Sequence, residues 1–295
     1  MKNPTALSRR GFTKLLGAGA AYAALRPALG LSESTPKPTD TKSSDVVRLS
    51  SNENPYGPSA AALKAMTAGF ALAWKYPDEK QDELVEALAK LNQVAKENIL
   101  TGAGSGEILK VAVAAFTGPE EKLVVGDPTF EACVGHAKAS RAEAIKVTLN
   151  ATYGHDLTKM GDVQGVGLHY ICNLNNPSAS ITPKAELSAF LDKVPRETMV
   201  LVDEAYHHFV ETADYESVIP LVKDHPNLIV ARTFSKVYGM AGLRCGYCVA
   251  QPEKIELMRA ELNAGATYVI AEAREAGNVG IYRGSGEVRE GLVQE

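Results

Sequence analysis

Lys236 is the residue of this sequence whose surroundings most clearly suggest covalent chemistry. It lies in RTFSKVYGMAGLRCGY (residues 232–247), directly after an apolar run and eight positions before Arg244. An amine attacks carbonyl compounds when desolvation or a neighbouring positive charge lowers its pKa, and Arg244 can supply that charge. Because an isolated lysine is usually solvated surface, the interpretation depends on the residues that accompany Lys236.

Other segments place polar groups next to predicted strands. TGAGSGEIL (residues 101–109) opens a predicted helix, so its amides and the helix dipole can bind a phosphate. Asp203 ends the apolar run of MVLVDEAYHHF, and Asn176 lies in an Asn-Pro turn. Pyridoxal phosphate needs such a set, because its aldehyde reacts with a lysine, its ring nitrogen pairs with an acid, and its phosphate binds amides, hydroxyls and an arginine.

Other interpretations of these segments stay open or are disfavoured. Glu107 stands where a dinucleotide fingerprint needs its third glycine, so a different phosphate ligand or a plain Gly-rich turn fits better. The sequence holds no GxxxxGK[ST] segment, which disfavours ATP hydrolysis. His207 and His208 are adjacent and do not share a helix face, which disfavours a two-histidine metal site. Asp203 can also be a structural ion pair or a cap.

From residue 46 onward, predicted strands alternate with predicted helices, which favours a mainly parallel sheet covered by helices. Several strands are apolar throughout, as expected where both faces of a sheet are covered. Ligands of such sheets gather at the carboxyl ends of the strands, where Asn176, Asp203 and Lys236 are predicted to lie. The predicted helices span residues 59–74, 82–92, 105–116, 183–194 and 252–263, and the predicted strands span residues 122–127, 143–149, 167–173, 198–204, 227–233 and 245–250.

The composition indicates a globular protein that binds a small molecule. The chain has 295 residues, 45% apolar and 22% charged, and its net charge of −4 gives no basic surface for a nucleic acid. Four cysteines are too few for a disulfide framework, which favours folding in a reducing compartment. CGYC (residues 245–248) resembles a redox motif, but it continues an apparent strand, so we expect buried strand positions instead.

The N-terminus predicts a segment separate from the fold. SRRGFTK (residues 8–14) places twin arginines ahead of an apolar run too short to span a bilayer comfortably. We expect a twin-arginine signal peptide and an exported or periplasmic protein with no membrane contact after cleavage, a basic amphipathic first helix being the alternative. The predicted segments are the signal peptide over residues 1–30, a polar linker over 31–46, an N-terminal arm over 47–80, a large cofactor-binding domain over 81–250 and the start of an incomplete C-terminal small domain over 251–295.

Seven stretches together resemble the fold-type-I pyridoxal phosphate aminotransferases of class I/II, and are most similar to the histidinol-phosphate aminotransferase-like branch. The resemblance covers roughly residues 47–263 and implies a three-layer α/β/α sandwich with a mainly parallel sheet, plus an incomplete small domain. The stretches are LSSNENPYGPS (49–59), KYPDEKQDEL (75–84), TGAGSGEIL (101–109), VGDPTFEAC (125–133), ICNLNNPSASITP (171–183), VLVDEAYHHF (200–209) and RTFSKVYGMAGLRCGY (232–247).

The resemblance implies a role for each matching residue and implies no metal. Lys236 would bind pyridoxal 5'-phosphate as a Schiff base and then shuttle the Cα proton, while Asp203 would hold the proton of the ring nitrogen. Tyr76 would reach the phosphate of a neighbouring subunit, which implies a homodimer. Tyr206 and Asn176 would bond the phenolic oxygen of the cofactor, Phe130 would stack on its ring, and its phosphate would bind Gly104, Ser105, Gly106, Ser235 and Arg244.

Two departures from the family pattern matter. NNPSAS (residues 175–180) replaces the usual NNPTG, so Ala179 must take the place of a glycine. The tail has no recognisable counterpart of the arginine that grips the substrate carboxylate, and no motif assigns that role to Arg274, Arg283 or Arg289. We interpret the chain as a truncated or altered member, and expect that cofactor binding survives while transamination is weak or lost.

The leading functional hypothesis is an exported aminotransferase that moves an amino group between an L-amino acid, or a related amine such as histidinol phosphate, and a 2-oxo acid. A lyase or decarboxylase on the same fold is the nearest enzyme alternative, and a need for a 2-oxo acid separates the two. A catalytically weak cofactor-binding or interaction protein is the alternative from another class. Histidine biosynthesis is disfavoured, because its phosphorylated intermediates are cytoplasmic whereas the signal points outward.

Overall fold

The computed structural model describes residues 50–262, 281–282 and 288–289. The chain divides into two compact units, residues 1–51 and residues 52–295. The central sheet and all the helices described below belong to the second unit. The predicted signal peptide and linker lie outside the described residues, and the predicted domain boundaries stay predictions.

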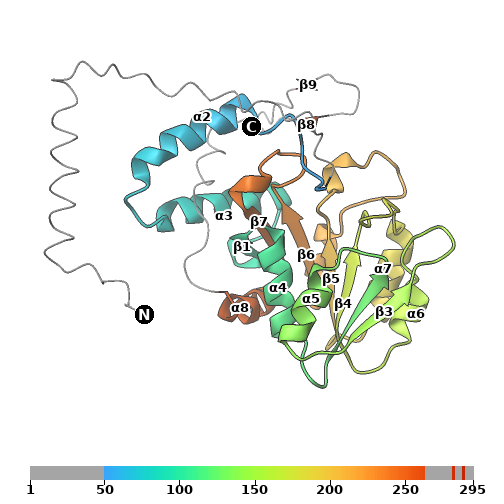
Figure 1. Ribbon diagram of the computed structural model, residues 1–295. Helices are drawn as coiled ribbons and strands as arrows, with labels where there is room; N and C mark the ends of the chain where they lie inside the picture. Colours follow the sequence, from blue (N-terminus) through green and yellow to red (C-terminus); the bar gives the residue numbers. More distant parts are fainter. Residues whose placement is uncertain (1–49, 263–280, 283–287, 290–295) are drawn as a thin grey trace, which may run out of the picture. The chain divides into compact units, whose positions relative to one another are not determined.

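A seven-stranded sheet forms the centre of the second unit (Figure 1). Four of its neighbouring pairs are parallel, and β7 alone runs against the others because it pairs antiparallel with both β1 and β6. The prediction of a mainly parallel sheet is therefore confirmed. In spatial order the strands are β1 (Ile99–Ala103), β7 (Cys245–Val249), β6 (Leu228–Thr233), β5 (Met199–Asp203), β4 (Val166–Cys172), β2 (Lys122–Asp127) and β3 (Ala144–Thr148).

Each face of the sheet packs against its own layer of helices, as β5 illustrates. Met199 and Leu201 belong to one hydrophobic core, and Val200 and Val202 to the other, because successive strand side chains point to opposite faces. Burying one such side chain fully stabilises the fold by about 1.5–3 kcal/mol. The first core includes residues of α4 (Ser105–Phe116), α5 (Ala132–Ala139) and α8 (Pro252–Ala260), and the second includes residues of α2 (Ala60–Gly69), α3 (Asp78–Asn92), α6 (Leu157–Gly161) and α7 (Lys184–Lys193).

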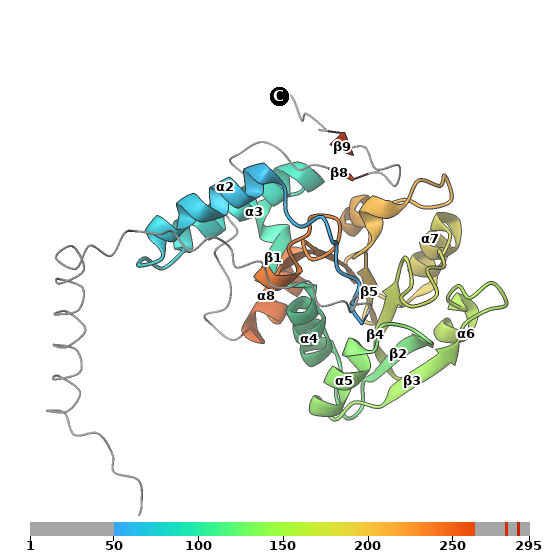
Figure 2. The same cartoon turned by 45° about the horizontal axis from the view of Figure 1, so that its top comes forward.

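This arrangement confirms the three-layer α/β/α sandwich. α4 and α5 pack side by side on one face, and α6 and α7 pack together on the other, as both views show (Figures 1 and 2). Among the described residues, no helix is both long and apolar enough to cross a membrane.

Two predicted helices differ from the observed ones by about four residues or more at one end. The α-helical part of the first begins after Ser59, whose hydroxyl accepts from the Ala62 amide, but it ends at Gly69 and a 3-10 helix, η2 (Phe70–Leu72), follows. The prediction of a helix start at residue 82 was wrong, because α3 already begins at Asp78. The carboxylates of Asp78 and Glu79 lie in its first turn, where the helix dipole favours negative charge.

Several short elements were not predicted. β1 is five residues long and contains Gly102, so its sequence indicates only an apolar run before the glycine-rich loop. α5 and α6 are short as well. The remaining elements are the 3-10 helices η3 (Lys96–Asn98), η4 (His207–Phe209), η5 (Ile219–Lys223) and η6 (Ala241–Leu243), and the two-residue strands β8 (Ile281–Tyr282) and β9 (Val288–Arg289).

Candidate active site

The carboxyl ends of four strands bring the predicted site residues to one edge of the sheet. β4, β5 and β6 are parallel, and β1 runs in the same direction as β6 because β7 is antiparallel to both. Asn176 follows β4, Asp203 ends β5, Lys236 follows β6 and Gly104 follows β1. The sheet topology therefore gathers residues that lie far apart in the sequence, as the parallel-sheet prediction requires.

Lys236 contacts two residues that approach it from different parts of the chain. Its Nζ lies 5.4 Å from the centre of the Tyr206 ring and donates a hydrogen bond to the main-chain oxygen of Asn52 at 3.0 Å. The Asn52 side chain in turn donates to the Tyr206 hydroxyl at 2.8 Å. Asn54 donates to the Val237 carbonyl at 2.9 Å, so the segment around residues 52–54 is bonded to the lysine loop twice.

Asp203 is a buried carboxylate, with only 3% of its surface exposed. The Tyr170 hydroxyl donates to its Oδ2 and the Ala205 amide donates to its Oδ1, each at 3.1 Å. Burial raises the pKa of Asp203 to about 6, while these two hydrogen bonds and the charge of Lys236 act to lower it. A pKa of about 6 leaves Asp203 mostly ionised at neutral pH, and a positive charge placed beside it would favour the ionised form further.

The turn between β1 and α4 forms a cradle for an anion. Gly104 has a φ of 78°, and a Cβ at this position would lie 2.9 Å from the Arg244 Cζ, so only glycine lets the guanidinium pack against the loop. The Arg244 side chain also donates to the Ala103 carbonyl at 3.3 Å. In the part of the chain that the structure describes, no side chain caps α4. The Glu107 amide donates to the Gly104 carbonyl at 3.2 Å, and the amides of Ser105 and Gly106 precede this first bond of the helix. Backbone amides and a guanidinium together favour a phosphate.

The other predicted site residues differ in how deeply they are buried. Ser235 is buried, and its amide donates to the Thr233 hydroxyl at 3.1 Å. Asn176 is half-buried after β4. Phe130 is 41% exposed in the turn after β2, and Tyr76 is 92% exposed between η2 and α3. The structure therefore brings Lys236 into contact with Tyr206, whereas Tyr76 is directed to solvent.

Two histidines support the loop that carries Tyr206. His207 Nδ1 lies 3.2 Å from the Tyr215 hydroxyl, and His208 Nε2 lies 2.9 Å from the Tyr238 hydroxyl. Burial and the charge of Arg232 lower the pKa of His207 to about 4 and that of His208 to about 3. Each ring therefore pairs with its own tyrosine as a neutral side chain, which explains the adjacent histidines without a metal.

Residues 44–274 match the family described as aminotransferase class I and II. The chain belongs to this family. It is 41% identical over 214 residues to histidinol-phosphate aminotransferase from Moorella thermoacetica, an alignment that covers 72% of this chain and 55% of that protein. The chain spans between 55% and 60% of the length of three histidinol-phosphate aminotransferases that it matches.

Solved aminotransferase structures share the fold. A putative histidinol-phosphate aminotransferase from Erwinia carotovora atroseptica superposes with a TM-score of 0.73 at 32% identity, covering 76% of this chain and 67% of that one. The histidinol-phosphate aminotransferase of Sinorhizobium meliloti, solved in complex with pyridoxal-5'-phosphate, gives a TM-score of 0.71 at 28% identity, with 77% and 62% coverage. These likenesses show that the chain shares the fold of solved aminotransferases.

The two cysteines of CGYC (residues 245–248) are buried strand residues and not a redox pair. Cys245 and Cys248 are buried in β7, and burial raises the pKa of each thiol to about 12. The prediction of buried strand positions is confirmed. Gly246 between them is the residue that matters for the site, because a Cβ there would contact the Ser105 amide nitrogen and lie 2.6 Å from the Gly104 carbonyl carbon.

The sequence pattern indicates no role for several residues that contact the site. Asn52 belongs to the LSSNENPYGPS stretch, yet its bonds to Lys236 and Tyr206 depend on how the chain folds back. Tyr170 lies inside an apolar strand, where only the register against β5 reveals its partner. Of the three tail arginines, Arg274 and Arg283 lie outside the described residues, and for Arg289 only the strand β9 is described.

Proposed function

We propose that this chain binds pyridoxal 5'-phosphate at the carboxyl edge of its sheet and acts as an aminotransferase between an amino acid, or a related amine, and a 2-oxo acid. The observation that carries the proposal is the chemistry of three groups at this edge: the Lys236 amine, the buried Asp203 carboxylate and the Arg244-flanked loop at Gly104. Membership of the aminotransferase class I and II family supports it.

The residues present fit this cofactor. The loop from Gly104 to Gly106 supplies amides to a phosphate, with Ser235 and Arg244 as further donors. Asp203 is an acceptor for a protonated ring nitrogen, since it is buried and already holds two hydrogen bonds that favour its charged form. Tyr206 and Asn176 offer a hydroxyl and an amide for a phenolic oxygen, and the exposed ring of Phe130 offers a stacking face.

When bound, pyridoxal phosphate supplies an aldehyde for amines and a protonated ring that withdraws electrons from the substrate Cα. Lys236 would hold the cofactor covalently, and once a substrate amine had replaced it, its Nζ would carry the proton from Cα to the reacting carbon of the cofactor. Asp203 would keep the ring nitrogen protonated. Tyr206, beside Lys236 and bonded to Asn52, orients the reacting end.

A visible absorption spectrum tests the proposal. Purified protein with added pyridoxal phosphate is expected to show the band of a lysine-bound cofactor, and one member of a panel of L-amino acids or histidinol phosphate is expected to convert it to the spectrum of the amine form. A 2-oxo acid should then restore the first spectrum. The Lys236→Ala variant is the control. A wild-type protein without the band contradicts cofactor binding, and turnover without any 2-oxo acid contradicts transamination in favour of a lyase or decarboxylase.

A homodimer is part of the proposed function. Several large apolar side chains near one another in the sequence are exposed, among them Phe70, Trp74 and Tyr76, and these support an interface. Tyr76, 92% exposed, is the residue that we expect to reach the second copy's phosphate site. Sedimentation velocity tests this expectation: a dimer supports it, and a monomer that retains full cofactor affinity contradicts it.

Export through the twin-arginine route is the remaining proposal. The segment SRRGFTK followed by an apolar run supports it. Replacement of Arg9 and Arg10 by lysine should keep the protein inside the cell, and cell fractionation that finds the variant exported to the same extent contradicts this route.

A further inference from the structure

Tyr170 lies directly behind the carboxylate that the proposed function assigns to the ring nitrogen. It belongs to β4, the neighbour of β5, in a parallel register that pairs Tyr170 with Leu201 and Cys172 with Asp203. Its side chain is fully buried in the same core as Leu201. Because side chains two residues apart on a strand share a face, Asp203 points to the same side of the sheet as Leu201. The register therefore brings the phenol and the carboxylate together.

The geometry makes Tyr170 a specific partner of one carboxylate oxygen. Its hydroxyl donates to Asp203 Oδ2 at 3.1 Å, whereas the Ala205 amide donates to Oδ1. A hydrogen bond to a charged acceptor is stronger than one between two neutral groups. One donor on each oxygen fixes the plane of the carboxylate and leaves the remaining lone pairs for a ligand.

Other titratable groups also face Asp203. Cys133 approaches from α5 and Cys172 from β4, Glu204 is the next residue in the chain, and Lys236 lies beyond the end of β6. The two buried thiols have raised pKa values, chiefly through burial, and stay neutral. Glu204 is held by Arg232 at 2.7 Å. Of the titratable side chains around Asp203, Lys236 and Tyr170 favour its charged form. In the proposed chemistry Lys236 reacts with the cofactor and the substrate, so Tyr170 is the one that stays beside Asp203 throughout.

We propose that Tyr170 is a positioning residue, whose hydroxyl keeps the Asp203 carboxylate ionised and aimed at the ring nitrogen of the cofactor. The inference rests on the proposed function. The tyrosine supplies constant stabilisation of the carboxylate even while Lys236 is occupied with the substrate. Its chemistry is hydrogen bonding alone, and it contacts neither cofactor nor substrate.

The first test measures Asp203 itself, in protein without added cofactor. Carbon NMR of aspartate labelled at Cγ follows its titration in the wild type, in Tyr170→Phe and in Tyr247→Phe. The last is a matched control, because it removes a buried phenol from the same sheet whose hydroxyl accepts from Asn92 instead. We expect Tyr170→Phe to move the Asp203 midpoint upward by about one pH unit or more. A midpoint equal to that of the Tyr247→Phe control overturns the inference.

A second variant keeps the test decisive if Tyr170→Phe fails to fold. Difluorotyrosine at position 170 retains the ring and makes the phenol a stronger donor, so it should shift the Asp203 midpoint downward. An upward shift or no shift overturns the inference.

The second test separates this inference from the proposed function. The affinity of each variant is measured for pyridoxal phosphate and for its analogue in which carbon replaces the ring nitrogen. Tyr170→Phe should bind pyridoxal phosphate about tenfold more weakly than the wild type and should bind the analogue as tightly as the wild type does. Asp203→Asn shows the largest loss of affinity for pyridoxal phosphate that is expected. If the wild type binds no pyridoxal phosphate, the proposed function fails, and the NMR titration still decides the role of Tyr170. If Tyr170→Phe loses both ligands equally, the role is structural and the inference fails.

Discussion

Ala179 illustrates how one residue adapts a family motif. It replaces the glycine of the usual Asn-Asn-Pro-Thr-Gly turn and adopts a φ of 55°, as the sequence predicted it must. The turn is held by the Ala179 amide, which donates to the Asn175 carbonyl at 2.8 Å, and by the Asn175 side chain, which donates to Ser178 at 2.7 Å. Hydrogen bonds of the turn thus hold Ala179 in a backbone conformation that favours glycine.

Ala179→Gly should therefore stabilise the protein. Relief of the left-handed conformation outweighs the added freedom of the unfolded chain, and we expect the free energy of unfolding to rise by about 0.5–1 kcal/mol. Urea denaturation followed by circular dichroism measures the change. Ala68→Gly, on the exposed side of α2, is the control and should lower stability by about 1 kcal/mol. A loss at position 179 as large as the control's would contradict this account of the turn.

At this scale, strand ends could be predicted from the sequence and side-chain partners could not. Asp203 and Lys236 follow apolar runs, and parallel strands present their carboxyl ends at a common edge, so their closeness was predictable. Tyr170 and Asn52 have no such signal. Their roles depend on strand register and on the path of a loop, which neither periodicity nor spacing encodes.

β7 is the element that sets the position of the turn between β1 and α4, the proposed phosphate-binding loop. It is the one antiparallel strand in the described sheet, and it pairs with β1, whose end opens into Gly104 and Ser105. Gly246 lets the backbone of β7 approach this turn closely, since a Cβ there would overlap the loop. The glycine of CGYC is thus required by packing against the loop and not by any chemistry of the flanking cysteines.

Gly246→Ala should displace the loop and weaken cofactor binding. A methyl group 2.6 Å from the Gly104 carbonyl carbon forces the turn to move, and overpacking of this kind costs about 1–3 kcal/mol. We expect the affinity for pyridoxal phosphate, followed by absorbance titration, to fall about tenfold or more. Gly242→Ala, where no atom lies within 4 Å of the added carbon, is the control. Equal affinities of the two variants for pyridoxal phosphate would show that the close approach of β7 to the Gly104 turn does not determine cofactor binding.

Elements with a strong local pattern were predictable, and those without one were not. β2, β4, β5, β6, β7 and α4 were expected near their observed bounds, because an apolar run or a glycine-rich start marks each. β1 is as long as β5 and β7 but contains Gly102, and tertiary contacts rather than local pattern decide its conformation and that of α5. The early start of α3 reflects its first-turn carboxylates, a signal that the sequence contained.

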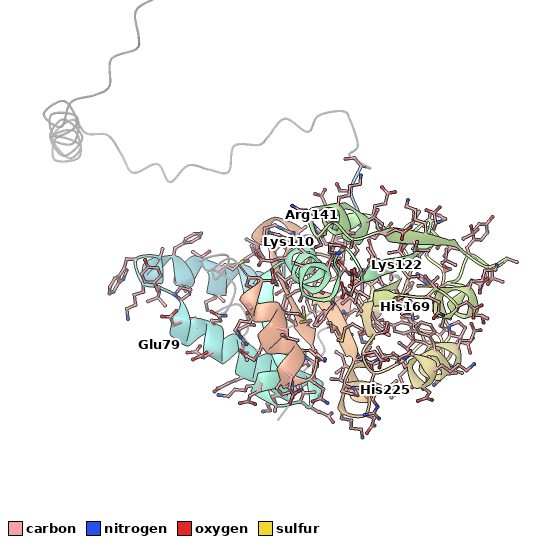
Figure 3. All side chains as sticks on the ribbon, turned by 90° about the horizontal axis from the view of Figure 1, so that it is seen from below. Glu79, Lys110, Lys122, Arg141, His169 and His225 are labelled. Atoms are coloured by element: carbon pink, nitrogen blue, oxygen red, sulfur yellow. The ribbon has the colours of Figure 1, made fainter. Side chains whose placement is uncertain are left out.

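The molecule as a whole carries two buried histidines outside the site. His155 and His169 are 1% and 3% exposed, and one ring nitrogen of each has no hydrogen-bond partner in the described part of the structure. His169, labelled in Figure 3, lies on β4 and packs edge-on against Phe190 of α7. Burial lowers the pKa of each ring from 6.5 to about 4. Both stay neutral in the folded protein where the unfolded chain binds protons.

The free energy of unfolding should consequently fall as the pH drops from 6.5 to about 4. Below pH 4 the contribution of these two histidines no longer changes. Each histidine can lower the free energy of unfolding by about 3 kcal/mol over this window, because a difference of one pKa unit corresponds to 1.36 kcal/mol. His169→Leu should abolish its share, as measured by urea denaturation at several pH values. Ile255→Ala, which removes a buried side chain from the other hydrophobic core and adds no titratable group, should lower stability equally at all pH values. An acid dependence of His169→Leu equal to the wild type's would contradict the assignment.

The central claim is that Lys236 is the covalent anchor of a pyridoxal phosphate site, and chemical trapping tests it most directly. The protein is mixed with pyridoxal phosphate, reduced with borohydride, digested and mapped by mass spectrometry, with Lys236→Ala treated in parallel. The account predicts the added mass on the peptide containing Lys236 in the wild type and no stoichiometric label in the variant. A stoichiometric label on another lysine, or none in the wild type, would contradict it.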